Sequence, residues 1–390
     1  MTINGAAYIV GAYEHPIRKA TGQSIAQLHA EVARGALEDA GLTTADVDGY
    51  FCAGDVPGLG PISMAEYLGL NVRHVDTTNT GGSAYVVAVS HAAQAIAAGK
   101  CNVALITMAG TPRAGIAVEG EIAYMTDRSS PDVPYELPFN PNTVAVYALA
   151  ARRHMHEFGT TSEQLAWVKV AASMHAQHNP HAMLRNVVSV DDVLGSAMIA
   201  DPLHKLDCCV VSDGGGAIVV ARPEIARELA RPRVKLRGAG EALKGIYGGG
   251  AVDIISSAGV RSGAAAFAEA GVQASDIDYA SLYDSFTITV IIQLEDLGFC
   301  PKGEGGKFVA DGGLVSGSGR LPVNTDGGGL CNNHPAHRGG MPKIIEAVRQ
   351  LRGEAAAAVQ VPGCGLALVH GTGGYISTRH GSATLILERE

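Results

Sequence analysis

The feature that most constrains the fold of this chain is an internal repeat. Residues 39–48 read DAGLTTADVD and residues 269–278 read EAGVQASDID, each after an Ala-rich stretch with helical periodicity. A second pair follows in the same order, because 91–110 (HAAQAIAAGKCNVALITMAG) corresponds to 343–353 (KIIEAVRQLRG) followed by 364–374 (CGLALVHGTGG). The first pair alone would also fit a common helix-to-strand link. Together the pairs favour a duplicated α/β unit, which explains a chain of 390 residues without two unrelated domains.

Helical periodicity alternates with short β-branched runs along the chain. The pattern predicts helices near 24–40 and 84–98, each followed by a glycine that ends a helix. It predicts a strand near 49–53, and the continuous apolar run 101–110 indicates a strand buried on both faces. This β-α-β alternation predicts a mainly parallel sheet in the α/β class.

A segment of different character separates the two repeats. Residues 111–206 open with a proline-rich loop and continue with two amphipathic helices, near 144–158 and 161–178. An insertion of this kind usually forms a lid or a pocket wall. We therefore predict an N-terminal half, 1–230, that includes this inserted loop region, and a C-terminal half, 231–390.

Composition excludes several classes of function. The net charge is −9 and the basic residues are scattered, so no nucleic-acid partner is expected. No apolar run approaches the ~20 residues that a membrane helix needs, and the first residues do not resemble a signal peptide. The seven cysteines lack the spacing of a zinc site or a disulfide framework, so no metal is expected. We expect a cytoplasmic protein with reduced thiols.

Five motifs carry a resemblance to a known family. They are NTGGSAYVVAVSHAAQAIAAG (79–99), SDGGGAIVVA (212–221), SLYDSFT (281–287), NNHPAHRGG (332–340) and HGTGGY (370–375). Together they resemble the thiolase superfamily over essentially the whole chain, specifically the sterol-carrier-protein-type thiolases and thiolase-like lipid-transfer proteins. The resemblance implies a thiolase fold, with duplicated βαβαβαββ halves in a layered α/β/α/β/α arrangement and an inserted loop domain. It also implies a homodimer and acyl-CoA substrates, with coenzyme A as part of the substrate and no permanently bound cofactor.

The first motif lacks the residue that defines thiolase chemistry. In the family a cysteine at a helix N-terminus, where the thiolate is stabilised, attacks the thioester. Alignment on the helix end places Gly82 at this nucleophile position, and no cysteine occurs between Cys52 and Cys101. Loss of a covalent nucleophile costs about 10⁶ in kcat. The neighbouring Ser83 is either a helix N-cap or, if a base lies within reach, a substitute nucleophile.

Three other motif residues are candidates for catalysis by resemblance. Tyr283 stands where the family has the Asn or His that holds an oxyanion-hole water, and His334 matches the histidine that donates to the thioester oxygen. His370 stands where typical thiolases carry the second, acid/base cysteine, and sterol-carrier-type members also have histidine there. As a base, Tyr283 would need a pKa well below the reference value of about 10. Packing roles for Tyr283 and His334 stay open.

Two further residues are possible members of the site. Cys331 lies three residues before His334 and is either a displaced nucleophile or a buried, inert thiol. Tyr375 follows His370 by five residues and either faces the same pocket or packs elsewhere.

The surviving motif residues suit enolate chemistry better than acyl transfer. They predict retro-aldol cleavage of a β-hydroxyacyl-CoA, with a base at the β-hydroxyl and donors at the thioester oxygen. Thiolase-like proteins with tyrosine at position 283 resemble steroid side-chain aldolases, which implies a small partner protein with a zinc ribbon and an OB fold. Two alternatives stay open: an acyl-CoA acyltransferase with a displaced nucleophile, and a non-catalytic protein that binds acyl-CoA or lipid.

Overall fold

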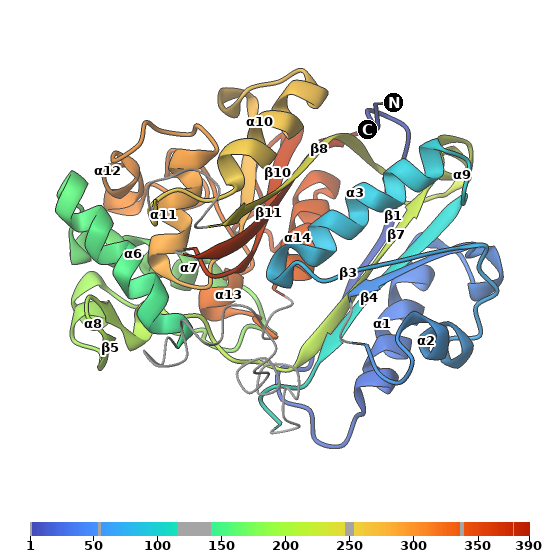
Figure 1. Ribbon diagram of the computed structural model, residues 1–390, viewed down its shortest axis with the longest axis horizontal. Coiled ribbons are helices and arrows are strands. Elements are labelled where there is room, and N and C mark those ends of the chain that lie inside the picture. Colours follow the sequence, from blue (N-terminus) through green and yellow to red (C-terminus); the bar gives the residue numbers. More distant parts are fainter. Residues whose placement is uncertain (1, 54–55, 115–141, 246–252, 336–338, 377) are drawn as a thin grey trace.

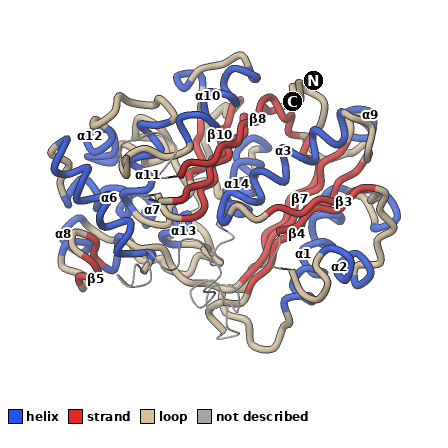
Figure 2. The backbone as a smooth tube through the Cα atoms, viewed as in Figure 1, coloured by secondary structure: helices blue, strands red, loops and turns tan. Residues whose placement is uncertain are grey.

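A computed structural model describes residues 2–53, 56–114, 142–245, 253–335, 339–376 and 378–390. Most of its strands belong to one sheet that runs through the molecule (Figure 2). These strands are β1 (Tyr8–Glu14), β2 (Gly49–Ala53), β3 (His74–Thr78), β4 (Val103–Gly110), β7 (Gly214–Ala221), β8 (Val234–Gly245), β9 (Tyr279–Leu282), β10 (Leu366–Gly374) and β11 (Arg379–Arg389). Within the described residues the sheet has nine strands in the order β3-β2-β4-β7-β1-β8-β11-β10-β9.

The sheet is mixed, so the prediction of a mainly parallel sheet is wrong. In the described chain β2 pairs in parallel with β3 and β4, and β10 with β9. The pairs β4–β7, β7–β1, β1–β8, β8–β11 and β11–β10 are antiparallel. Strands buried on both faces read as continuous apolar runs in either pairing, so the sequence pattern did not separate the two arrangements.

The long helices agree with the sequence pattern. They are α1 (Ile25–Ala40), α3 (Ala84–Ala97), α6 (Thr143–Phe158), α7 (Ser162–Ala176), α10 (Gly259–Ala270), α11 (Thr287–Asp296) and α14 (Gly340–Arg352). The shorter ones are α2 (Pro61–Tyr67), α8 (Val190–Leu194), α9 (Pro223–Glu228), α12 (Gly305–Val309) and α13 (Gly328–Cys331). Helix α1 shows the local cause: Ser24 Oγ accepts from Gln27 N at 3.1 Å, and Gly41 ends the helix at φ 72°.

The internal repeat corresponds to a repeated local structure. Both segments leave their helix through a short 3₁₀ turn, where an aspartate accepts from the backbone N–H three residues earlier. This bond is 2.8 Å between Asp46 and Thr43 and 2.9 Å between Asp276 and Gln273. Strands β2 and β9 follow these turns. The parallel third strand of the first half, β3, is matched in the second half by the bridge between Ala280 and Val323.

The layered arrangement predicted from the resemblance is present. Helices α3 and α14 lie between the two parts of the sheet and contact strands of both halves (Figure 1). Helix α1 covers the outer face of β1, β4 and β7, and α10 covers the outer face of β8 and β11. The core around α3 and α14 is built from small and β-branched side chains, which allow close approach of helix and sheet. The sheet continues between the halves where Tyr8 and Ile9 pair with Lys235 and Val234.

The insertion forms a helical subdomain on one side of the sheet. It contains α6, α7, α8 and a hairpin of β5 (Met198–Ala200) and β6 (Leu203–His204), and both predicted helices are present. Its residues 115–141 lie outside the described chain. The predicted division at residue 230 falls in the connection from α9 to β8, and the two-domain division stays a prediction. In the part of the chain that is described, every helix is too short or too polar to cross a membrane.

Candidate active site

Gly82, the predicted nucleophile position, has no room for a side chain. Gly82 is buried in a 3₁₀ turn directly before α3. A Cβ atom on Gly82 would lie 2.4 Å from Cε2 and Cζ of Tyr283 and 2.4 Å from the carbonyl oxygen of Thr372. Such distances are far inside van der Waals contact. The ring of Tyr283 therefore occupies the space in which a side chain at position 82 would begin.

Ser83 occupies the N-cap position of α3, but its hydroxyl does not cap the helix. The hydroxyl donates to the carbonyl oxygen of Thr80 at 2.7 Å and lies 3.1 Å from Thr80 Oγ1. Its hydrogen bonds within the described residues include none to a histidine or a carboxylate. These contacts give no support to Ser83 as a nucleophile, because a serine needs an adjacent base.

Tyr283 lies at the carboxyl end of β9, with its ring against that of His334. The two ring centroids are 5.3 Å apart with an edge-on angle of 75°. A Cβ atom on Gly339 would lie 3.0 Å from both Tyr283 Cε2 and His334 Cδ2. Gly82 and Gly339 thus provide the space in which the phenol and the imidazole meet.

The environment of Tyr283 keeps its phenol protonated. The side chain is 5% exposed. Burial raises its pKa well above 10, and the nearby Cys209, Tyr147 and Asp284 add to the rise. A backbone hydrogen bond at Gly339 acts in the opposite direction. A base at this position would need a lowered pKa, so the structure favours Tyr283 as a hydrogen-bond donor.

The backbone of His334 is held by a buried chain of polar contacts. Its N–H donates to Ser212 Oγ at 2.8 Å, and the Ser212 hydroxyl donates to Asn333 Oδ1 at 2.8 Å. Asn333 Nδ2 donates in turn to Glu14 Oε1 at 2.9 Å. The segment before α14 is therefore anchored to β1, at the centre of the sheet.

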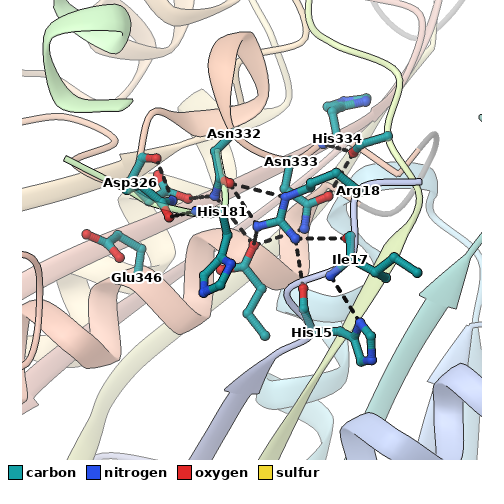
Figure 3. Close-up of polar contacts among 12 residues, drawn as sticks. His15, Ile17, Arg18, His181, Asp326, Asn332, Asn333, His334 and Glu346 are labelled. Atoms are coloured by element: carbon teal, nitrogen blue, oxygen red, sulfur yellow. Dashed lines mark hydrogen bonds and ion pairs between the residues drawn. The ribbon is translucent and has the colours of Figure 1, made fainter. Parts of the chain in front are cut away.

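Arg18 connects this chain of contacts to the neighbouring side chain of Asn332 (Figure 3). Its guanidinium lies 2.7 Å from Glu14 Oε1 and donates to Asn332 Oδ1 at 2.8 Å. Arg349 adds an ion pair to Glu14 at 3.1 Å. Burial alone would raise the pKa of Glu14, but Arg18 and Arg349 outweigh it and lower this pKa to about 2. The carboxylate is thus charged and able to orient Asn332 and Asn333.

A buried ion pair is formed by Asp284, the residue that follows Tyr283, and Lys343. Lys343 Nζ of α14 is 2.5 Å from Asp284 Oδ1, and both side chains are at most 2% exposed. Asp284 also accepts from the backbone N–H groups of Gly329 at 2.7 Å and Leu330 at 3.1 Å. The residue after Tyr283 therefore holds α13, the element that leads to His334. Sequence reasoning missed both charges, although the acid inside SLYDSFT and the lysine directly before the apolar pair Ile344 and Ile345 were visible signals.

The structure does not bring the side chain of His370 to Tyr283. Side chains alternate along β10, and a Cβ atom on Gly371 would lie 3.0 Å from Ser83 Cα, on the α3 side. His370 faces the other way, with Nδ1 2.8 Å from Thr384 Oγ1 and Nε2 toward Gly259 of α10. Burial lowers its pKa to about 3. The main-chain N–H of Tyr283 donates to the carbonyl oxygen of His370 at 3.0 Å, and the catalytic role of His370 stays a prediction.

Cys331 and Tyr375 are the two remaining candidates from the sequence. Cys331 is buried in α13, where burial raises the pKa of its thiol, as expected for an inert thiol. Tyr375 is half-buried with the guanidinium of Arg379 5.7 Å from its ring centroid. Neither arrangement provides an activated nucleophile.

Comparisons with known proteins agree with this architecture. A family model described as "Thiolase C-terminal domain-like" matches residues 241–389. A "Steroid side-chain-cleaving aldolase" of Thermomonospora curvata is 38% identical over 90% of this chain and 91% of its own length. An "Acetyl-CoA acetyltransferase" of Methanothermobacter thermautotrophicus is 33% identical over 94% and 96%. The solved structure "Ltp2-ChsH2(DUF35) aldolase" has a TM-score of 0.87 and 34% identity, covering 99% of this chain and 98% of that chain.

The chain belongs to the thiolase superfamily. At the N-terminus of α3, the residue type at position 82 and the place of the Tyr283 ring are sterically coupled. The ring fills the space beside Gly82, the predicted nucleophile position, so a larger side chain at position 82 and the observed ring position exclude each other.

Replacement of Gly82 by alanine tests this packing. We expect Gly82→Ala to destabilise the protein by about 1–3 kcal/mol, because the methyl group meets the Tyr283 ring and the Thr372 carbonyl. In a Tyr283→Ala background the same change should cost less, since one of the two obstacles is gone. The measurement is urea unfolding of the four proteins, with Gly245→Ala as a control because its Cβ meets nothing within 4 Å. Equal costs in both backgrounds would contradict the coupling.

Removal of one member of the buried ion pair gives a second prediction. Lys343→Met should destabilise the protein by about 3–5 kcal/mol, because it leaves the Asp284 carboxylate buried without its cation. The double variant Lys343→Met/Asp284→Asn should recover part of this loss, since no uncompensated charge is left. The unfolding free energies of both variants provide the comparison. A double variant no more stable than Lys343→Met would show that the pair is not the relevant interaction.

Proposed function

We propose that this chain is a carbon–carbon lyase that cleaves β-hydroxyacyl-CoA thioesters by a retro-aldol reaction. The reaction proceeds through a thioester enolate and needs no acyl-enzyme. The observation that carries the proposal is the ring of Tyr283, which fills the space beside Gly82 and lies edge-on to His334. If Gly82 marks the nucleophile position, as the sequence predicts, the proposed site holds a phenol donor and an imidazole in place of a thiolate.

The proposed role of Tyr283 follows from its protonation state, and that of His334 from its position against the phenol ring. Tyr283 keeps its proton and donates to the thioester oxygen as negative charge develops there, a contribution of about 3–4 kcal/mol for a preorganised donor. His334 accepts the β-hydroxyl proton, the Cα–Cβ bond breaks, and an aldehyde or ketone departs. The imidazolium then returns the proton to Cα and gives the shortened acyl-CoA. The sequence had suggested the reverse assignment, with Tyr283 at the hydroxyl and His334 at the thioester oxygen.

The relatives support this reaction class. The Thermomonospora curvata relative is named for cleavage of steroid side chains, and the solved neighbour is named as an aldolase with a ChsH2(DUF35) component. We propose by analogy that this chain acts on a bulky, tertiary or secondary β-hydroxyacyl-CoA. A homodimer and a small partner with a zinc ribbon and an OB fold belong to the same proposal, with coenzyme A entering as part of the substrate.

Acyl transfer is the second candidate, favoured by the similarity to an acetyltransferase. It requires a displaced nucleophile. The hydroxyl of Ser83 is bonded to Thr80, and burial raises the pKa of the Cys331 thiol. A non-catalytic protein that binds acyl-CoA is the third candidate, and it would not depend on the Tyr283 hydroxyl.

Removal of the phenol hydroxyl tests the lyase. We expect Tyr283→Phe to lower kcat by about 10²–10³, because the ring still fills its space while the donor is lost. His334→Gln should be similarly impaired through loss of the proton acceptor. Chromatography with mass spectrometry would follow carbonyl product and shortened acyl-CoA from a panel of β-hydroxyacyl-CoAs that includes steroid thioesters.

The matched control is Tyr67→Phe, which removes a hydroxyl from an exposed tyrosine on α2 and should leave the rate unchanged. The assay is run with and without any co-expressed DUF35-type partner. The proposed function would be contradicted by full activity of Tyr283→Phe. It would also be contradicted if no panel member is turned over, either with or without the partner.

A further inference from the structure

The insertion carries a second buried tyrosine toward the site. Tyr147 lies on α6 and is 3% exposed. Its ring centroid is 4.6 Å from that of Phe286, at an interplanar angle of 33°. Phe286 follows Tyr283 by three residues, at the start of α11. Helix α6 is therefore packed directly on the segment that presents the catalytic phenol.

The hydroxyl of Tyr147 lies near two groups, the side chain of Ser285, with which it forms a hydrogen bond, and the carbonyl oxygen of Gly374. It reaches the carbonyl oxygen of Gly374 at 3.4 Å, whereas O–H···O bonds are most often about 2.7–2.8 Å long. Gly374 ends β10 next to the turn that holds Gly82, since a Cβ atom on Gly81 would lie 3.1 Å from Gly374 N. The hydroxyl thus lies at the glycine-lined wall of the site, where a substrate oxygen could replace its long contact with Gly374.

The two phenols share one electrostatic environment. After burial, the neighbours that raise the pKa of Tyr283 are Cys209 and then Tyr147. Burial also raises the pKa of Tyr147; a hydrogen bond with Ser285 acts in the opposite direction, and Cys209 and Tyr375 add to the rise. Both phenols therefore keep their protons, and the site contains two O–H donors beside one imidazole.

A retro-aldol substrate presents two oxygens at the reacting centre, the thioester oxygen and the β-oxygen. We propose that Tyr147 is a further catalytic residue, an inference that rests on the proposed function. Tyr147 donates a hydrogen bond to the β-oxygen, while Tyr283 donates one to the thioester oxygen. This bond directs the β-hydroxyl proton toward His334 and stabilises the β-oxygen while its charge increases. The insertion then supplies part of the chemistry, and recognition of the β-oxygen depends on α6.

A binding comparison tests this role independently of turnover. The probes are a β-hydroxyacyl-CoA and the saturated acyl-CoA of the same length, measured by calorimetry on the wild-type chain and on Tyr147→Phe. The phenylalanine ring retains the packing on Phe286. We expect the variant to weaken binding of the β-hydroxy ligand at least fivefold and to leave the saturated ligand within twofold. We also expect kcat for cleavage to fall about 10²–10³.

The control is Tyr50→Phe, which removes a buried hydroxyl bonded to Thr107 at 2.9 Å, away from the site. It should change neither the ligand preference nor kcat, and circular dichroism verifies that both variants fold. Equal weakening of both ligands by Tyr147→Phe, or no weakening of either, overturns the β-oxygen contact. A cleavage rate that survives in Tyr147→Phe but not in Tyr283→Phe overturns it as well and leaves the lyase proposal intact. The calorimetric comparison decides the contact even where no carbonyl product forms.

Discussion

The packing of the Tyr283 ring against the backbone of Gly82 is the constraint on which the rest of the site depends. Helix α3 begins at Ala84, directly after the turn that holds Gly82, so the positive end of its dipole lies at this turn. A thiol cannot be added there while the ring is present, because a Cβ atom on Gly82 would lie 2.4 Å from two ring carbons. The turn before α3 thus has the electrostatics that favour a thiolate, while its geometry leaves no room for a side chain at position 82.

The buried charges around the site hold the segments that carry Tyr283 and His334 in place. The Lys343–Asp284 pair joins α14 to the end of β9, and Asp284 also holds the first turn of α13. Glu14 and Arg18 orient the asparagines before His334 (Figure 3). Buried charges of this kind are costly to desolvate, and they are tolerated when each one is paired and hydrogen-bonded. We infer that these charges fix the positions of the site residues, because they hold the segments that bring a phenol and an imidazole into ring contact.

The sequence predicted the parts of this structure that depend on local signals. Capping residues and glycines marked α1 and α3, and the repeat identified the duplicated unit with its 3₁₀ turns. Motif resemblance found Tyr283 and His334, which the structure brings together. It could not show that His370 faces α10, because strand register decides which face a side chain takes.

Other features depend on partners far along the chain. The mixed pairing of the sheet joins strands that are distant in the sequence. The bond between Asp284 and Lys343 spans 59 positions, and the contact between Tyr147 and Gly374 spans 227. No local pattern encodes such contacts. The direction of the pKa change at Tyr283 also follows from packing, since burial by several segments decides it.

The most direct test of the account is the mass of the intact protein during a single turnover in D₂O. With a cleavable β-hydroxyacyl-CoA, we expect the protein to keep its unmodified mass at every time point. Carbonyl product should appear together with a shortened acyl-CoA that carries one deuterium at Cα. A chain that gains the mass of an acyl group, and passes this group to added coenzyme A, would contradict the central claim that the chemistry proceeds without a covalent nucleophile.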